Sequence, residues 1–181
     1  MSEEEMDKEK VFDILTVGHP ILRQKAEKVS DLREVGPLCE VMVGTMRASK
    51  GVGLAAPQIG KSISIIVVEI PKNELLPNRP VSPLFIMINP EIANFSNEKE
   101  YDWESCLSIP GLKGRVPRSR SVTVQYTSLD GCHHENLFDG FLARLIQHEC
   151  DHLLGIMFLE RMESMAEIYS VENWWKFIMK T

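Results

Sequence analysis

The chain has 181 residues, of which 44% are hydrophobic and 25% charged, a composition typical of one soluble globular domain with a substantial core. Its net charge of −6 argues against a nucleic-acid-binding protein that relies on bulk positive charge. No run approaches the ~18 apolar residues that span a bilayer, and the acidic start lacks the features of a signal or transit peptide. We therefore expect a cytoplasmic protein with no membrane or direct nucleic-acid partner, in which residues 1–10 are a disordered acidic tail and residues 11–181 form a single domain.

The first half of the domain is predicted to contain one helix and two strands. Ser30 or Asp31 can cap a helix in which apolar residues recur at helical spacing up to Met46. A Gly-rich segment follows, and then come a β-branched strand at Ser62–Ile70 and a second buried strand in "LFIMINPEI".

The second half is predicted to form a hairpin and two helices. Residues 121–138 have the pattern of a hairpin that turns at Asp130-Gly131, and a helix should run from an Asp139 cap to about Leu154. A short extended piece follows at "IMFLERM", and Ser164 is expected to cap a last helix through "MAEIYSVENWWKFIM". Strands around one central helix, with helices at both chain ends, predict an α+β domain.

The stretch "QHECDH" holds two histidines four residues apart, with a glutamate directly after the first. On a helix His148 and His152 share a face, so both imidazoles can bind one metal while Glu149 acts on its water. The alternative is a solvated helix face, but the flanking segments are apolar nearly all round and favour a buried helix. Leu145 and Phe141, three and seven residues before the first histidine, predict an apolar wall beside the metal.

Two other residues of this stretch have separate interpretations. Asp151 can orient an imidazole or make an ordinary buried polar contact, and the sequence leaves both open. Cys150 lies on the opposite side of the helix from His148 and is expected to be a core thiol.

A catalytic site of this kind needs a third protein ligand. Cys106, in the loop "WESCLSIPG", would supply a strong, soft thiolate. Glu172, 20 residues after His152, matches the spacing of metalloproteases whose third ligand is a later glutamate. The residues favour Cys106, because its polar loop offers no obvious core to join, but they do not decide.

Three segments, in this order, resemble the peptide deformylase family: "GVGLAAPQ" at 51–58, "ESCLS" at 104–108 and "QHECDH" at 147–152. Ser105 replaces a commoner glycine. The resemblance implies an α+β fold in which small, mostly antiparallel sheets wrap around a central metal-binding helix, with N- and C-terminal helices. It also implies that residues 11–181 form a catalytic domain that removes the formyl group from the starting methionine of new polypeptides and releases formate.

The resemblance implies a metal site with three ligands, which are Cys106, His148 and His152. It implies that Glu149 is the general acid/base, and that Gln58 with the backbone N–H of Leu107 stabilises the oxyanion. It further implies one divalent metal, natively ferrous iron, with zinc, nickel or cobalt able to occupy the site.

The substrate is expected to be an N-formylmethionyl nascent peptide, whose methionine side chain enters an apolar pocket of Val52, Phe141 and Leu145. The backbone near Gly53 and at Ile109-Pro110-Gly111 would pair with this peptide as an added strand.

Around the metal ligands, Glu104 is expected to pair with Arg118 and brace the loop that holds Cys106, with Asp151 as a further supporting residue. Whether Arg144 faces the pocket mouth or solvent is open.

The substrate implies transient proximity to the ribosome, although the C-terminal segment is not basic enough to predict docking there. Two other hypotheses remain: an endopeptidase with Glu172 as third ligand, and a non-catalytic binding protein.

Overall fold

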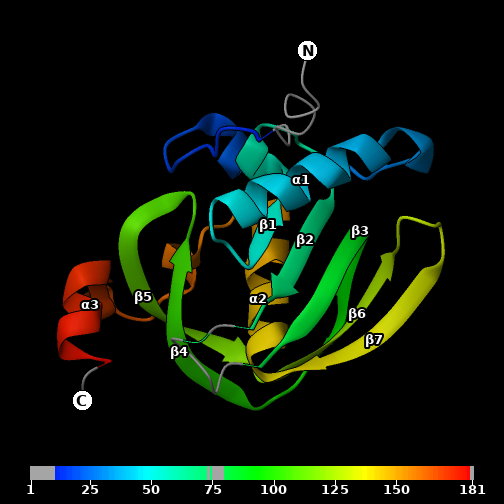
Figure 1. The fold of residues 1–181 in the computed structure, drawn as a ribbon. Coiled ribbons are helices and arrows are strands. Elements are labelled where there is room, and N and C mark those ends of the chain that lie inside the picture. Colours follow the sequence, from blue (N-terminus) through cyan, green and yellow to red (C-terminus); the bar gives the residue numbers. More distant parts are fainter. Residues whose placement is uncertain (1–10, 73, 75–79, 180–181) are drawn as a thin grey trace.

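The computed structural model describes residues 11–72, 74 and 80–179, and in it two antiparallel sheets lie against one central helix, α2 (Gly140–Leu153) (Figure 1). The predicted tail, residues 1–10, lies outside the described residues. The α+β class with antiparallel sheets around this helix is confirmed. Among the described residues, no helix has the length and apolar character needed to cross a bilayer.

The larger sheet has five strands in the order β1-β2-β3-β6-β7. These strands are β1 (Gly53–Ala55), β2 (Ile65–Ile70), β3 (Ser82–Phe95), β6 (Ser121–Thr127) and β7 (His133–Asp139). The smaller sheet has the order β4-β5-β8, with β4 (Lys99–Cys106), β5 (Ile109–Ser119) and β8 (Ile168–Ser170). The predicted hairpin at 121–138 is β6 and β7, and Gly131 in its turn has a φ of +87° that suits glycine.

Apart from Glu69, strand β2 is apolar because helices cover both faces of the sheet there. Ile66 and Val68 belong to the core cluster that includes α2, whereas Ile65 and Val67 pack into the cluster that includes α1 (Gly36–Ala48). Alternate side chains of a strand point to opposite faces, so each face of β2 packs against its own helix. This packing fixes α2 against the sheet.

The N-terminal helix begins later than predicted, and several 3-10 helices of three or four residues lie elsewhere in the described chain. Asp31 caps the 3-10 helix η3 (Leu32–Glu34), and α1 starts only at Gly36. Other 3-10 segments are η2 (Pro20–Arg23), η4 (Ala56–Ile59), η5 (Phe158–Arg161) and η6 (Met165–Glu167). The extended piece predicted at 156–162 is wrong, because η5 occupies most of it. At the start of α2, Asp139 holds the N-cap position but makes no side-chain capping bond.

The last helix predicted from Ser164 is interrupted. Ser164 caps only η6, and Ile168–Ser170 then form β8, which pairs with the edge of β5. Ser170 caps the remaining helix, α3 (Val171–Phe177). Sheet pairing of a β-branched and an aromatic residue therefore competes successfully with the helix that the local pattern predicted.

The sequence reading also missed that Cys106 ends a strand. Cys106 is the last residue of β4, and it pairs with Ile109 at the start of β5. The many charged residues of β4 and the prolines of β5 hide the alternation that marks a strand. The consequence is that Cys106 is held at a hairpin tip rather than in an isolated loop.

Candidate metal centre

Three side chains that can act as metal ligands come together from the smaller sheet and from α2. Cys106 comes from the tip of the β4–β5 hairpin, and His148 and His152 come from successive turns of α2. Their ligand atoms lie within 4.8 Å of one another, and Cys106 Sγ is 3.2 Å from His152 Nε2. No other group of three His, Cys, Asp or Glu side chains in the described part of the chain has this spacing. The structure thus brings together the three residues predicted as ligands.

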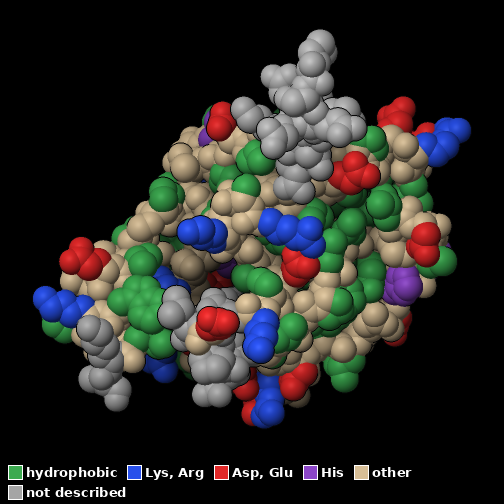
Figure 2. Space-filling model, in the orientation of Figure 1, with side chains coloured by type: hydrophobic (Ala, Val, Ile, Leu, Met, Phe, Trp, Pro, Cys, Tyr) green, Lys and Arg blue, Asp and Glu red, His purple; other side chains and the backbone are tan. Residues whose placement is uncertain are grey.

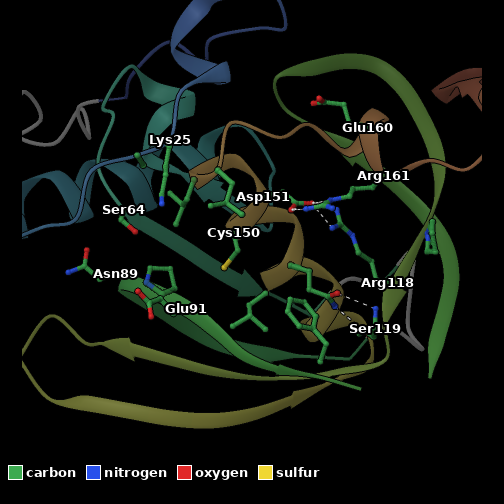
Figure 3. Close-up of a pocket in the computed structure, with 18 of the residues that line it drawn as sticks. Lys25, Ser64, Asn89, Glu91, Arg118, Ser119, Cys150, Asp151, Glu160 and Arg161 are labelled. Carbon is green, nitrogen blue, oxygen red and sulfur yellow. Dashed lines mark hydrogen bonds and ion pairs between the residues drawn. The ribbon is translucent and has the colours of Figure 1, made fainter. Parts of the chain in front are cut away.

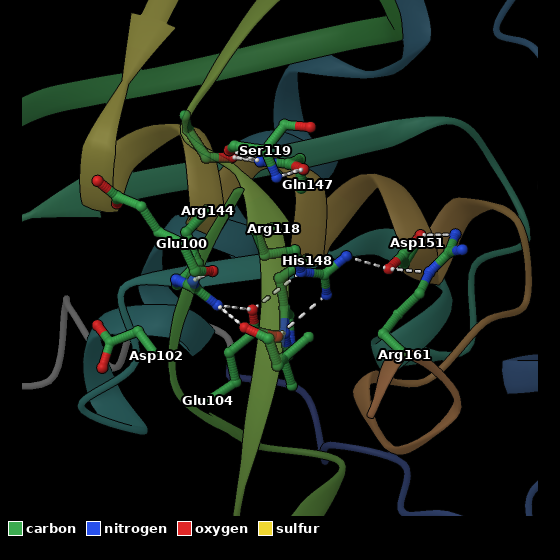
Figure 4. Close-up of polar contacts among 12 residues, drawn as sticks. Glu100, Asp102, Glu104, Arg118, Ser119, Arg144, Gln147, His148, Asp151 and Arg161 are labelled. Atoms are coloured by element: carbon green, nitrogen blue, oxygen red, sulfur yellow. Dashed lines mark hydrogen bonds and ion pairs between the residues drawn. The ribbon is translucent and has the colours of Figure 1, made fainter. Parts of the chain in front are cut away.

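Glu104 fixes the ring of His148. The imidazole Nδ1 lies 2.8 Å from Glu104 Oε2, so Nδ1–H donates to the carboxylate and Nε2 is left for a metal. Arg118 holds the same carboxylate in a bidentate pair, with Nε 2.9 Å from Oε1 and Nη2 3.0 Å from Oε2 (Figure 4). Burial alone would raise the pKa of Glu104, but the hydrogen bonds from His148 and Arg118 hold it well below its usual range. Glu104 is therefore an anion that keeps its neighbouring imidazole oriented.

Arg144 answers a question that the sequence left open. It is buried, and its Nη1 lies 2.9 Å from Glu104 Oε1 and 2.8 Å from the carbonyl oxygen of Val116 (Figure 4). Its Nη2 donates to the carbonyl oxygen of Glu100 at 2.6 Å. Arg144 is thus a second cation on Glu104, a role that its position on an apolar helix could have signalled, because a buried guanidinium needs an acceptor.

Asp151 supports the site through arginine and not through an imidazole. Its Oδ2 lies 2.5 Å from Arg118 Nη1, and its Oδ1 lies 2.6 Å from Arg161 Nη2 (Figure 4). Of the two interpretations offered for Asp151, the structure has the buried polar contact. The residue that orients an imidazole is Glu104, and Asp151 positions the arginine that holds Glu104.

Glu149 points its carboxylate at the edge of β1. A Cβ atom at Gly53 would lie 2.8 Å from Glu149 Cδ and 2.9 Å from Cγ, so only glycine leaves room for this approach. Among the described residues, neither Glu149 Oε2 nor His152 Nδ1 has a hydrogen-bond partner, although both are buried. Burial raises the pKa of Glu149 to about 7. A carboxyl group with this pKa can accept and return a proton near neutral pH.

These observations fit a metal. A thiolate and two imidazoles are three of the ligands of a tetrahedral catalytic site, and the fourth position is kept for water or substrate. The unpaired Glu149 oxygen is the group that such a water would need beside it.

Gln58 presents its amide nitrogen to the sulfur ligand. Its Oε1 accepts from the backbone N–H of Ala55 at 2.8 Å, which fixes the orientation of the amide. Its Nε2 then lies 3.1 Å from Ser108 Oγ and 3.6 Å from Cys106 Sγ. The amide N–H group of Gln58 is thus positioned beside Cys106, His148 and His152, which are called the donor cluster below.

A cavity of about 940 Å³ opens over the cluster, and Figure 2 shows the hollow on the surface between α1 and α3. Its walls include the proposed catalytic residues Gln58, Leu107 and Glu149. They also include most of the predicted substrate-binding residues, namely Val52, Gly53, Gly111, Phe141 and Leu145. Ile109 does not line it, because its side chain packs into the core cluster that contains Cys106.

A second cavity, of about 810 Å³, lies on the other side of α2 and shares no lining residue with the first (Figure 3). Cys150 lines it as a buried thiol, whose pKa burial raises strongly. This agrees with the expectation that Cys150 faces away from the histidines. Glu172, the alternative third ligand, is exposed on α3 and does not belong to the donor cluster.

Comparison with known proteins places this geometry in context. A model of the polypeptide deformylase family matches residues 11–167. The chain is 40% identical over 159 residues to a peptide deformylase of Leptospira biflexa, covering 85% of this chain and 89% of the relative. It is 45% identical over 152 residues to one of Desulforudis audaxviator, covering 83% and 93%. The crystal structure of a class I type b peptide deformylase from Acinetobacter baumannii with bound Met-Ala-Ser superposes with a TM-score of 0.81 at 40% identity, covering 85% of this chain and 99% of that one.

Proposed function

The chain belongs to the polypeptide deformylase family, and from that premise we propose that Cys106, His148 and His152 hold the metal at which it works. Its function is that of a metal-dependent hydrolase that removes the N-terminal formyl group from the formyl-methionine of newly synthesised polypeptides and releases formate. The observation that carries the proposal is the meeting of one sulfur and two imidazoles beside a buried carboxylate oxygen that has no hydrogen-bond partner among the described residues.

The proposed chemistry divides between the metal and the side chains around it. A divalent metal supplies a nucleophile near neutral pH by lowering the pKa of water. Glu149 takes the proton of the attacking water, for which its unpaired Oε2 is available, and later returns it to the departing amine nitrogen. Its pKa of about 7 suits both transfers.

Attack on the formyl carbon creates an oxyanion that needs hydrogen-bond donors. The Nε2–H of Gln58 is fixed by the Ala55 contact, and we assign it this role together with the backbone N–H of Leu107. Removing one such donor typically costs about 10²–10³ in rate.

The substrate is proposed to bind as an added strand beside β1 and the β5 hairpin, with its backbone near Gly53 and Gly111. Its methionine side chain would lie against Val52, Phe141 and Leu145, which line the same cavity as the donor cluster. Ile109 contributes through its backbone only, since its side chain is part of the core.

The native metal is proposed to be ferrous iron. A site with one thiolate and two imidazoles also accepts zinc, nickel or cobalt, so loading depends on which metal is available. A thiolate bound to ferrous iron is sensitive to oxidation by oxygen, so the enzyme should be handled without air. We further propose that it works in the cytoplasm on formylated chains as they leave the ribosome.

One assay tests the proposal. Formate release from formyl-Met-Ala is measured anaerobically with ferrous iron, for the wild type and for Glu149→Ala, and metal content is measured in both. We expect turnover by the wild type, and loss of turnover with retained metal in the variant. Loaded wild-type protein that releases no formate would favour a non-catalytic role instead.

A second variant separates this function from an endopeptidase that uses Glu172. Cys106→Ala should lose its metal if the sulfur is a ligand, whereas a protease site built on Glu172 would keep it. The exposed position of Glu172 already argues against the protease.

A further inference from the structure

The cavity over the donor cluster continues to the C-terminal helix. Trp174 and Trp175 of α3, and Met179 just after it, line the cavity. All three follow residue 167, where the match to the family model ends. The far wall of the substrate cavity is therefore made by a segment outside the residues that the family model describes.

The base of α3 is firmly attached to the hairpin that carries Cys106. Strand β8 pairs with β5 through Lys113 and Tyr169, and α3 follows directly. Trp174 is 8% exposed, and its ring packs edge-on against Trp103 of β4 with 6.2 Å between centroids. The ammonium of Lys113 lies 4.4 Å from the centroid of the same ring. These contacts hold the helix in a fixed place relative to the donor cluster.

The outer part of this wall is exposed and apolar. Trp175 is 43% exposed and Met179 is 42% exposed, and the Trp175 ring meets Trp174 edge-on at 5.2 Å. Figure 2 shows hydrophobic side chains gathered between α3 and the hollow. An exposed tryptophan braced by a buried one offers a flat surface that loses little freedom when a ligand packs on it.

The cavity runs from the cluster along β5, where Pro110, Gly111 and Lys113 line it, to the wall made by α3. Along β5, Ile109 sits opposite Cys106, and Lys113 lies four residues further, a rise of about 13 Å. An extended peptide whose formyl group reaches the cluster has its third residue about 7 Å beyond the methionine. Because alternate side chains share a face, the third residue points to the same side as the methionine, toward the cavity.

We propose that Trp175 and Met179 form a subsite for a bulky apolar side chain at the third residue of the formylated peptide. This inference rests on the proposed function. It makes the C-terminal segment a specificity element, which favours nascent chains whose third residue after the formyl group is apolar.

The test compares two substrates that differ only at the third residue, formyl-Met-Ala-Leu-Ser and formyl-Met-Ala-Gly-Ser. For the wild type loaded with metal, kcat/KM should favour the leucine peptide by about tenfold. In Trp175→Ala this ratio should fall toward one. Phe177→Ala is the matched control, because Phe177 is also an exposed aromatic of α3 but does not line the cavity, and it should keep the wild-type ratio.

A measurement without turnover supports the same comparison. Calorimetric affinity for the products Met-Ala-Leu-Ser and Met-Ala-Gly-Ser should show the same preference in the wild type and lose it in Trp175→Ala. A wild-type ratio near one, or a preference that survives in Trp175→Ala, would overturn the inference while leaving the proposed function intact. If the metal-loaded wild type deformylated none of the three peptides, formyl-Met-Ala included, the proposed function would be contradicted instead.

Discussion

Replacing Gly53 with alanine should disable the enzyme by displacing Glu149. The added Cβ would lie 2.8 Å from Glu149 Cδ and 2.9 Å from Cγ, whereas carbon atoms pack at about 3.5–4.0 Å. The carboxyl group must therefore move by about 1 Å. A displacement of this size in a reacting group costs about 10²-fold, so kcat/KM for formyl-Met-Ala should fall by about that factor with the metal retained.

Because Gly53 is also expected to face the substrate, the effect must be traced to Glu149. In a double-mutant cycle on the residual rates at high enzyme concentration, Gly53→Ala should reduce activity strongly in the wild type and hardly at all when Glu149 is already alanine. Gly36→Ala is the control, since a Cβ there meets nothing within 4 Å. Activity of Gly53→Ala within twofold of wild type, or full additivity in the cycle, would refute the reasoning.

Three further predictions concern the supporting structure. Glu104→Gln should weaken metal affinity by about 10–100-fold in competition with a chelator, and unchanged affinity would show that this carboxylate does not orient the ligand. Arg118→Ala removes the buried cation that Glu104 and Asp151 share, and it should lower the free energy of unfolding in urea by about 3–5 kcal/mol. The exposed Arg120→Ala should lose about 1 kcal/mol or less, and equal losses would contradict this. Gly155→Ala combines a φ of +74° with a Cβ 2.6 Å from the carbonyl carbon of Arg23, so it should lower Tm by several degrees, and a wild-type Tm would be the contrary result.

The helical half of the site could be predicted from the sequence because its geometry is local. Residues four apart on a helix must share a face, so His148 and His152 needed no tertiary information. Cys106 needed more, because its position depends on the register of β4 with β5, and the charged residues of β4 concealed that strand. The family resemblance supplied this ligand where spacing alone left Glu172 open.

The contacts around Glu104 show why the rest could not be foreseen. Its pairing with Arg118 was expected, but the hydrogen bond to His148 and the second cation from Arg144 join a strand to a helix across about forty residues. No local pattern encodes such a pairing. The contribution of α3 to the cavity wall was likewise hidden, since β8 interrupts the predicted helix before Trp175.

The central claim, a metal held by one sulfur and two imidazoles, is tested most directly by X-ray absorption of zinc-loaded protein. The account predicts one zinc per chain with a single sulfur at about 2.3 Å and two imidazole nitrogens at about 2.0–2.1 Å, and loss of the bound metal in Cys106→Ala. A first shell without sulfur, or a Cys106→Ala protein that keeps its zinc, would contradict it.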